Sequence, residues 1–99
     1  MIFKMDEKKK LNPLFMSELR LSIMSILIGA DEVDFNFIKE STGATSGNIS
    51  VQGDNLEKAG YITIKKTFDG KRPKTIYSIT DDGKIAFAEH YEALKSYFV

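Results

Sequence analysis

The sequence predicts an α+β fold: a three-helix core, a β-hairpin that makes a two- to three-stranded sheet, and a C-terminal helix. Three observations predict it. Apolar residues follow helical spacing early in the chain, two short capped helices follow each other across a turn, and two β-branched segments flank an Asp-Gly turn. The 99 residues, 42% hydrophobic and 28% charged, suffice for one folded domain.

The first core helix is predicted to begin at Leu14, directly after Pro13, which the first turn of a helix tolerates. Apolar residues then recur at helical spacing, and this pattern stops at Gly29. The spaced residues are Leu19, Ile23, Ile26 and Leu27. We expect residues 1–12 to form a flexible arm or a short extra helix, and residues 13–99 to form the domain.

A short strand and a second helix are predicted next. Apolar and polar residues alternate over residues 33–37, as in a strand that enters a turn. Asp34 or Asn36 then caps a helix over roughly residues 37–41, which ends at Gly43. The sequence does not decide which of these two residues is the cap.

A third helix follows after a turn of three or four residues. Thr45 and Ser46 cap it, and it runs to Ala59 before Gly60 closes it. Two short helices at this separation have the spacing of a helix-turn-helix.

A hairpin and a last helix complete the chain. Residues 61–66 and 75–79 read as strands around the turn at residues 68–70, with Pro73 at the entry of the second strand. Thr80 caps the last helix, and Asp81 and Asp82 favour its positive dipole end.

Positive charge is concentrated in the hairpin although the whole chain is neutral. Residues 65–75 hold five of the 14 basic residues and one of the 14 acidic residues. The rest of the chain is therefore acidic in balance, and one surface is suited to a polyanion. A basic hairpin directly after a helix-turn-helix is the winged helix arrangement.

The chain also resembles a known family, the winged helix-turn-helix transcriptional regulators related to MarR-like and ArsR-like repressors. The resemblance implies a dimeric regulator of transcription, with the third helix in the DNA major groove and the hairpin, or wing, beside it. It rests on residues 11–14, 18–24, 47–50, 56–62, 70–75 and 79–83.

The third helix has a polar face that suits DNA. Ile49, Leu56 and Gly60 share one side, which leaves small polar and amide side chains exposed. Amides can bond base edges, hydroxyls can bond phosphates, and Val51 can touch a thymine methyl. The predicted contacts are Thr45, Ser46, Gly47, Asn48, Ser50, Val51, Gln52, Asn55 and Lys58.

The wing is expected to supply salt-dependent affinity through its cations. Arg72 is the residue expected to enter the minor groove, because a guanidinium suits its narrow negative potential. The predicted wing contacts are Lys65, Lys66, Lys71, Arg72, Lys74 and Thr75. The alternative for these lysines is protection of a soluble sheet edge.

Two residues depart from the family pattern. Gly53 falls on the buried side of the third helix, where an aliphatic residue is usual, so either another side chain fills the space or the helix is weak there. Asp54 places an acid on the exposed face, where it repels phosphate.

Composition argues against several other functions. The chain has no cysteine and one histidine, His90, expected to be an exposed helix residue with a near-neutral pKa. We therefore expect no metal site, no cofactor and no enzyme activity, and we interpret Asp31, Glu32 and Asp34 as a solvated acidic turn. The absence of a long apolar run and of a signal peptide favours a soluble, cytoplasmic protein.

The expected function is a sequence-specific, double-stranded-DNA-binding regulator, most simply a repressor that occludes a promoter as a homodimer. Apolar side chains near the C-terminus favour a dimer joined through the helix at about residues 80–98. The predicted interface is Phe15, Phe87, Tyr91, Leu94, Tyr97 and Phe98. The alternative is a winged helix that binds another protein and no DNA; a small apolar effector ligand is left open.

Overall fold

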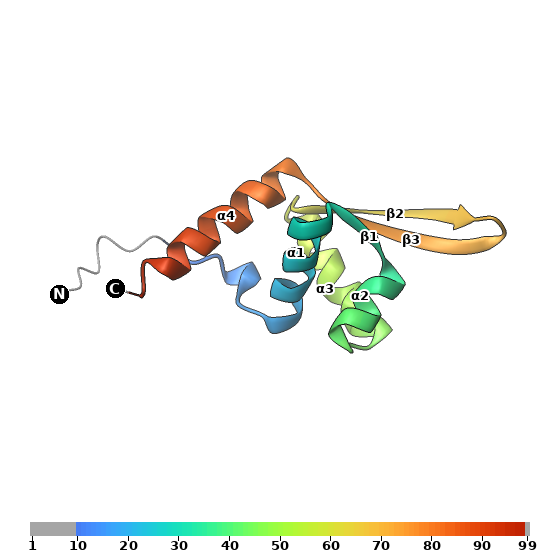
Figure 1. The fold of residues 1–99 in the computed structure, drawn as a ribbon, viewed down its shortest axis with the longest axis horizontal. Helices are drawn as coiled ribbons and strands as arrows, with labels where there is room; N and C mark the ends of the chain where they lie inside the picture. Colours follow the sequence, from blue (N-terminus) through green and yellow to red (C-terminus); the bar gives the residue numbers. More distant parts are fainter. Residues whose placement is uncertain (1–9, 99) are drawn as a thin grey trace.

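The computed structural model describes residues 10–98, and within them three helices pack against one face of a three-stranded antiparallel sheet (Figure 1). A further helix, α4, extends away from the hairpin (Figure 1). The helices are α1 (Glu18–Ala30), α2 (Phe35–Thr42), α3 (Ser46–Lys58) and α4 (Asp81–Lys95). The strands are β1 (Glu32–Asp34), β2 (Ile62–Asp69) and β3 (Arg72–Ile79). The predicted α+β winged helix fold is confirmed.

The core lies between the helices and the inner face of the sheet. Each of the first three helices contributes buried aliphatic side chains, and the sheet contributes Ile62 and Tyr77. The buried cluster is Phe15, Ile23, Met24, Leu27, Ile38, Ile49, Leu56, Ile62 and Tyr77. Burial of this apolar area is the main stabilising term of the fold.

Helix α1 differs from its prediction at both ends. It begins at Glu18, not Leu14, because the Ser17 hydroxyl accepts a hydrogen bond from the Arg20 N–H at 3.3 Å and caps it there. The preceding Pro13–Phe15 segment is a separate 3-10 turn, η2. Helix α1 also continues through Gly29 to Ala30 and ends where Asp31 adopts a positive φ of 65°.

The other helix starts follow the predicted caps. The Asp34 carboxylate accepts from the Phe37 N–H at 2.8 Å, so Asp34 and not Asn36 caps α2. Helix α2 begins at Phe35, which the alternation had assigned to a strand. Thr45 caps α3 and Thr80 caps α4, each through its side-chain hydroxyl, as predicted.

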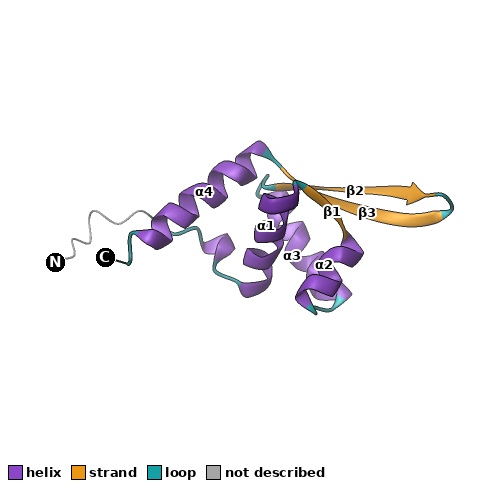
Figure 2. Ribbon diagram, in the orientation of Figure 1, coloured by secondary structure: helices purple, strands orange, loops and turns teal. Residues whose placement is uncertain are grey.

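The sheet has the order β1-β3-β2, and the hairpin strands β2 and β3 pair along their whole length. Asp69 pairs with Arg72, so the turn consists of Gly70 and Lys71 and not of the Asp-Gly pair that was predicted. Gly70 has a φ of 65°, as a glycine at the first central turn position can adopt. Strand β3 therefore begins at Arg72, three residues before its predicted start, and the hairpin projects far beyond the helices (Figure 2).

Gly53 lets a tyrosine ring from the sheet reach the α3 backbone. A Cβ at this position would lie 2.7 Å from Cε2 and 3.0 Å from the hydroxyl oxygen of Tyr77. The ring of Tyr77, only 2% exposed, thus fills the space that an aliphatic side chain would take. Burial, and then the negative charges of Asp54 and Glu57, raise the pKa of Tyr77 above 10.0. Of the two alternatives for Gly53, the structure therefore shows the first: a side chain from another element fills the space.

The chain before α1 is anchored to α4 through Asn12 and His90. The Asn12 N–H donates to His90 Nδ1 at 3.0 Å, and its side-chain amide donates to the Tyr61 hydroxyl at 3.0 Å. The prediction of an exposed His90 is wrong: the side chain is 2% exposed and its ring lies against Phe15. Burial lowers its pKa below 6.5. Most of the predicted N-terminal arm, residues 1–9, lies outside the described residues.

Candidate nucleic-acid interface

The N-terminal half of α3 presents the predicted polar face to solvent. Val51 is 56% exposed, and Gly47 has no neighbouring atom within 4 Å of the position a Cβ would take, so the backbone there is open to close approach. A helix N-terminus with accessible N–H groups favours phosphate. Of the predicted α3 contacts, Gln52 alone is half-buried; the exposed ones are Thr45, Ser46, Gly47, Asn48, Ser50, Val51, Asn55 and Lys58.

Three amide side chains on one flank of α3 are hydrogen-bonded to each other. Gln52 Nε2 donates to Asn48 Oδ1 at 3.2 Å, and Asn55 Nδ2 donates to Gln52 Oε1 at 3.4 Å. The guanidinium Nη1 of Arg20, on α1, also donates to Gln52 Oε1. The structure thus brings together the three predicted base-reading amides.

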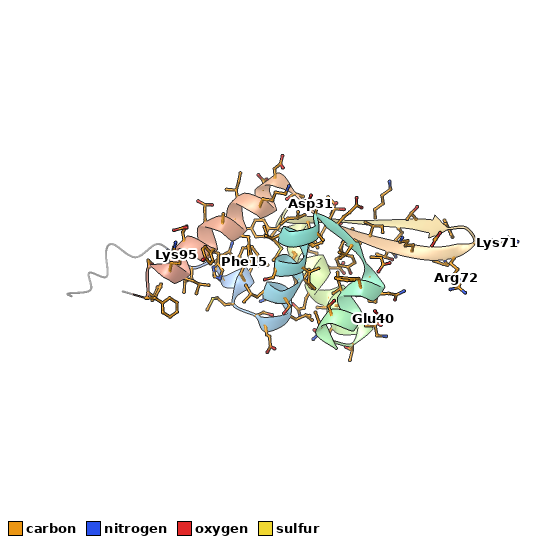
Figure 3. The ribbon with its side chains drawn as sticks, in the orientation of Figure 1. Phe15, Asp31, Glu40, Lys71, Arg72 and Lys95 are labelled. Carbon is orange, nitrogen blue, oxygen red and sulfur yellow. The ribbon has the colours of Figure 1, made fainter. Side chains whose placement is uncertain are left out.

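The wing carries its cations at and near the tip, with Lys71 and Arg72 farthest from the helices (Figure 3). Lys65, Lys66, Lys71 and Arg72 are exposed, whereas Lys74 and Thr75 are half-buried.

The strand register divides the predicted wing contacts between two faces. Because alternate residues and cross-strand partners share a face, Lys65, Lys74 and Arg72 lie together. Lys66 and Thr75 pair on the opposite face, which nearer the core carries Ile64 and Tyr77. The wing therefore offers positive charge on both faces.

The wing cations are not neutralised by acids of the described chain. No ion pair within residues 10–98 involves a wing lysine or Arg72. The acidic residues around β1 serve the fold: Asp31 pairs with Lys84 at 3.3 Å, and Asp34 caps α2. The positive hairpin is accordingly free to meet an external polyanion.

Two residues that the sequence interpretation missed belong to this surface. Arg20 stands inside an apolar helix, and nothing in the sequence places it beside Gln52. Phe68 is 70% exposed at the wing tip. An aromatic residue next to an Asp-Gly turn among lysines was the available signal for Phe68.

The predicted dimer residues fall into three groups. Phe15 is wrong as an interface residue, because it is 1% exposed and packs against Tyr61, Phe87 and His90 of its own chain. Phe87 and Leu94 are half-buried. Tyr91, Tyr97 and Phe98 are 57%, 44% and 81% exposed, and Ile85 adds a further exposed apolar side chain on α4.

The described residues contain no group of three His, Cys, Asp or Glu side chains arranged to hold a metal ion. Within residues 10–98, every helix is too short or too polar to cross a membrane.

Known proteins are similar to this chain in sequence and in fold. Residues 19–98 match the winged helix DNA-binding domain family. An uncharacterized protein of Methanocaldococcus jannaschii is 36% identical over 83 residues, which cover 83% of this chain and 90% of that protein.

Two solved structures extend the comparison. A transcriptional regulator homologue from Pyrococcus horikoshii superposes with a TM-score of 0.80 at 27% identity, over 86% of this chain and 84% of that one. A MarR-family transcriptional regulator from Rhodococcus has the same fold, with a TM-score of 0.61 at 24% identity over 87% of this chain and 63% of that one. The chain belongs to the family of winged helix DNA-binding domains.

Proposed function

We propose that this protein binds double-stranded DNA sequence-specifically and regulates transcription, without enzymatic activity or a cofactor. In this proposal α3 enters the major groove and the wing follows the backbone or the minor groove. The observation that carries it is the set of hairpin cations that form no ion pair within residues 10–98, on a hairpin that directly follows a helix with an exposed polar N-terminal half. The similarity to the transcriptional regulator homologue from Pyrococcus supports it.

The wing and α3 contribute differently to binding. Wing cations neutralise phosphates, which gives affinity that falls with salt, and the α3 amides contact base edges, which gives sequence preference. At the tip, Arg72 suits a narrow minor groove, and the exposed Phe68 is of the residue type that wedges between base steps there.

We further propose a homodimer that represses by occluding a promoter. Tyr91, Tyr97, Phe98 and Ile85 offer exposed apolar area on and just after α4, the helix that extends away from the wing (Figure 1). A two-fold pairing there would present two copies of α3 to half-sites about 34 Å apart, one turn of DNA.

The test is a titration of DNA binding against salt for the wild type and for a variant with Lys71, Arg72 and Lys74 replaced by Ala. We expect the slope of log K against log salt to fall in magnitude by about 2 to 3, since each phosphate contact contributes about 0.9. The control variant replaces Lys39, Lys84 and Lys95 by Ala, which removes the same charge from α2 and α4. A wild type that binds no DNA at low salt, or equal slopes in both variants, contradicts the proposal.

The second candidate is a module that binds another protein through the same surface. The exposed carboxylate of Asp54 on α3 favours it, because it repels phosphate. In that case the wing variant loses no DNA retention, since the wild type has none.

A further inference from the structure

Arg20 is the only side chain of α1 that the structure joins by a hydrogen bond to the flank of α3, within residues 10–98. Its Nε donates to the Leu14 carbonyl at 2.6 Å, and its Nη1 donates to Gln52 Oε1. Both Arg20 and Gln52 are half-buried. The guanidinium is therefore held in place between the turn before α1 and the helix that is proposed to read DNA.

A guanidinium fixes which way the neighbouring amide faces. Arginine can only donate hydrogen bonds, so the carbonyl oxygen and not the amine of Gln52 must face Arg20. The Gln52 amine then points toward Asn48, whose carbonyl oxygen accepts from it at 3.2 Å. On the other side, Asn55 places its amine against the same Gln52 oxygen at 3.4 Å.

This orientation leaves opposite groups free on the two asparagines. The oxygen of Asn48 accepts a hydrogen bond from Gln52, and the amine N–H groups of Asn48 remain available to a partner. Asn55 has turned its amine toward Gln52, which leaves its carbonyl oxygen. The two exposed ends of the amide chain thus differ: a donor at Asn48 and an acceptor at Asn55.

We infer that Arg20 is a positioning residue that sets the base preference of α3 through Gln52. This inference rests on the proposed DNA binding. An amide donor finds a major-groove acceptor on G, T or A but none on C, and an amide oxygen selects the amino groups of A or C. The contacted strand is therefore expected to exclude C opposite Asn48 and to hold A or C opposite Asn55.

The experiment selects bound sequences from a random DNA pool with the wild type and with Arg20→Met, which keeps the apolar stem and removes the guanidinium. Lys39→Met, on α2, is the control for the loss of one charge. Because Arg20→Met also loses the bond to Leu14, Gln52→Met serves as a second variant that leaves that bond intact. Thermal unfolding of each variant confirms that it is folded.

The expected result is a wild-type site with the stated preference, which Arg20→Met and Gln52→Met both relax at the same two positions. Discrimination there drops from about tenfold to about twofold or less, since an oriented base contact is worth at least about 1 kcal/mol. The salt slope of Arg20→Met stays at the wild-type value. A double variant that combines Arg20→Met and Gln52→Met weakens the base preference no further than either single variant. The two substitutions act on the same chain of hydrogen bonds, so their effects do not add.

Three outcomes overturn the inference. An unchanged base preference in Arg20→Met shows that the amides are oriented without it. A salt slope reduced by about 1 with an unchanged preference makes Arg20 a phosphate contact instead. A wild type that retains no DNA overturns the proposed function as well, and is thereby distinguished from the other two.

Discussion

Phe15 lies in the core and Phe68 on the wing, and the two aromatic residues have opposite surroundings. Phe15 is 1% exposed and lies against Tyr61, Phe87 and His90, whereas Phe68 is 70% exposed at the wing tip. Near Phe15, polar groups bond within the fold, as in the two hydrogen bonds that Asn12 donates. On the wing, β2 and β3 pair through their backbones, and the side chains of Lys65, Lys66, Lys71 and Arg72 stay exposed.

Replacing each phenylalanine by alanine is the strongest test of this contrast. Phe15→Ala lowers the free energy of unfolding by about 3–5 kcal/mol, because it removes a fully buried ring from the core. Phe68→Ala changes it by no more than about 0.5 kcal/mol, as for other exposed positions. Urea unfolding measures both values. Similar losses in the two variants would show that the wing tip is part of the core.

A smaller loss of stability is expected from a substitution at Gly53, where α3 contacts Tyr77 of β3. Gly53→Ala places a methyl group 2.7 Å from the Tyr77 ring, so the buried ring or the helix must shift. We expect a loss of about 1–3 kcal/mol in the free energy of unfolding, despite the better helix propensity of alanine. Gly47→Ala, on the same helix with no atom within 4 Å, is the control and gains about 0.5 kcal/mol. A stabilised Gly53→Ala variant contradicts the close contact.

The smallest expected effect is a pH dependence of the free energy of unfolding that is caused by His90, the α4 residue to which Asn12 is hydrogen-bonded. Burial lowers the pKa of His90 in the folded protein, so below about pH 6.5 the unfolded chain binds a proton that the folded chain resists. The free energy of unfolding therefore falls as the pH drops from about 6.5 to the folded pKa, and is constant above that range.

His90→Gln provides the comparison for this effect, because glutamine keeps a polar side chain that does not titrate. Unfolding is measured between about pH 5.5 and pH 8, where ordinary carboxylates stay ionised. The decline is expected in the wild type and absent from the variant. Parallel curves for the two proteins would show that His90 does not cause it.

Local signals in the sequence predicted most of the fold. Thr45, Asp34 and Thr80 are short polar residues at the starts of amphipathic segments, and each caps a helix as such residues do. The start of α1 was misplaced because Leu14 continues the apolar spacing, although Ser17 interrupts the helix with its own cap. Strand β3 starts early because Gly70 occupies the first position of the turn.

Contacts between distant segments could not be predicted. His90 lies on a helix face that is covered by Asn12 and Phe15, which return to it from the other end of the chain. Gly53 is explained by Tyr77, and the amide chain on α3 is explained by Arg20; both partners lie on other elements. The candidate residues on α3 and the wing were proposed from the sequence, but their grouping depends on packing and register.

The strand order has a consequence for how the chain reaches its native state. Strand β3 is the middle of the sheet, so β1, made early, has no strand to pair with until β3 has been synthesised. Tyr77, which closes the core over α3, arrives with the same strand. Helices α1, α2 and α3 precede the hairpin in the chain. A substitution that disturbs the Gly70–Lys71 turn is therefore expected to slow the folding of the whole domain and not merely of its outermost loop.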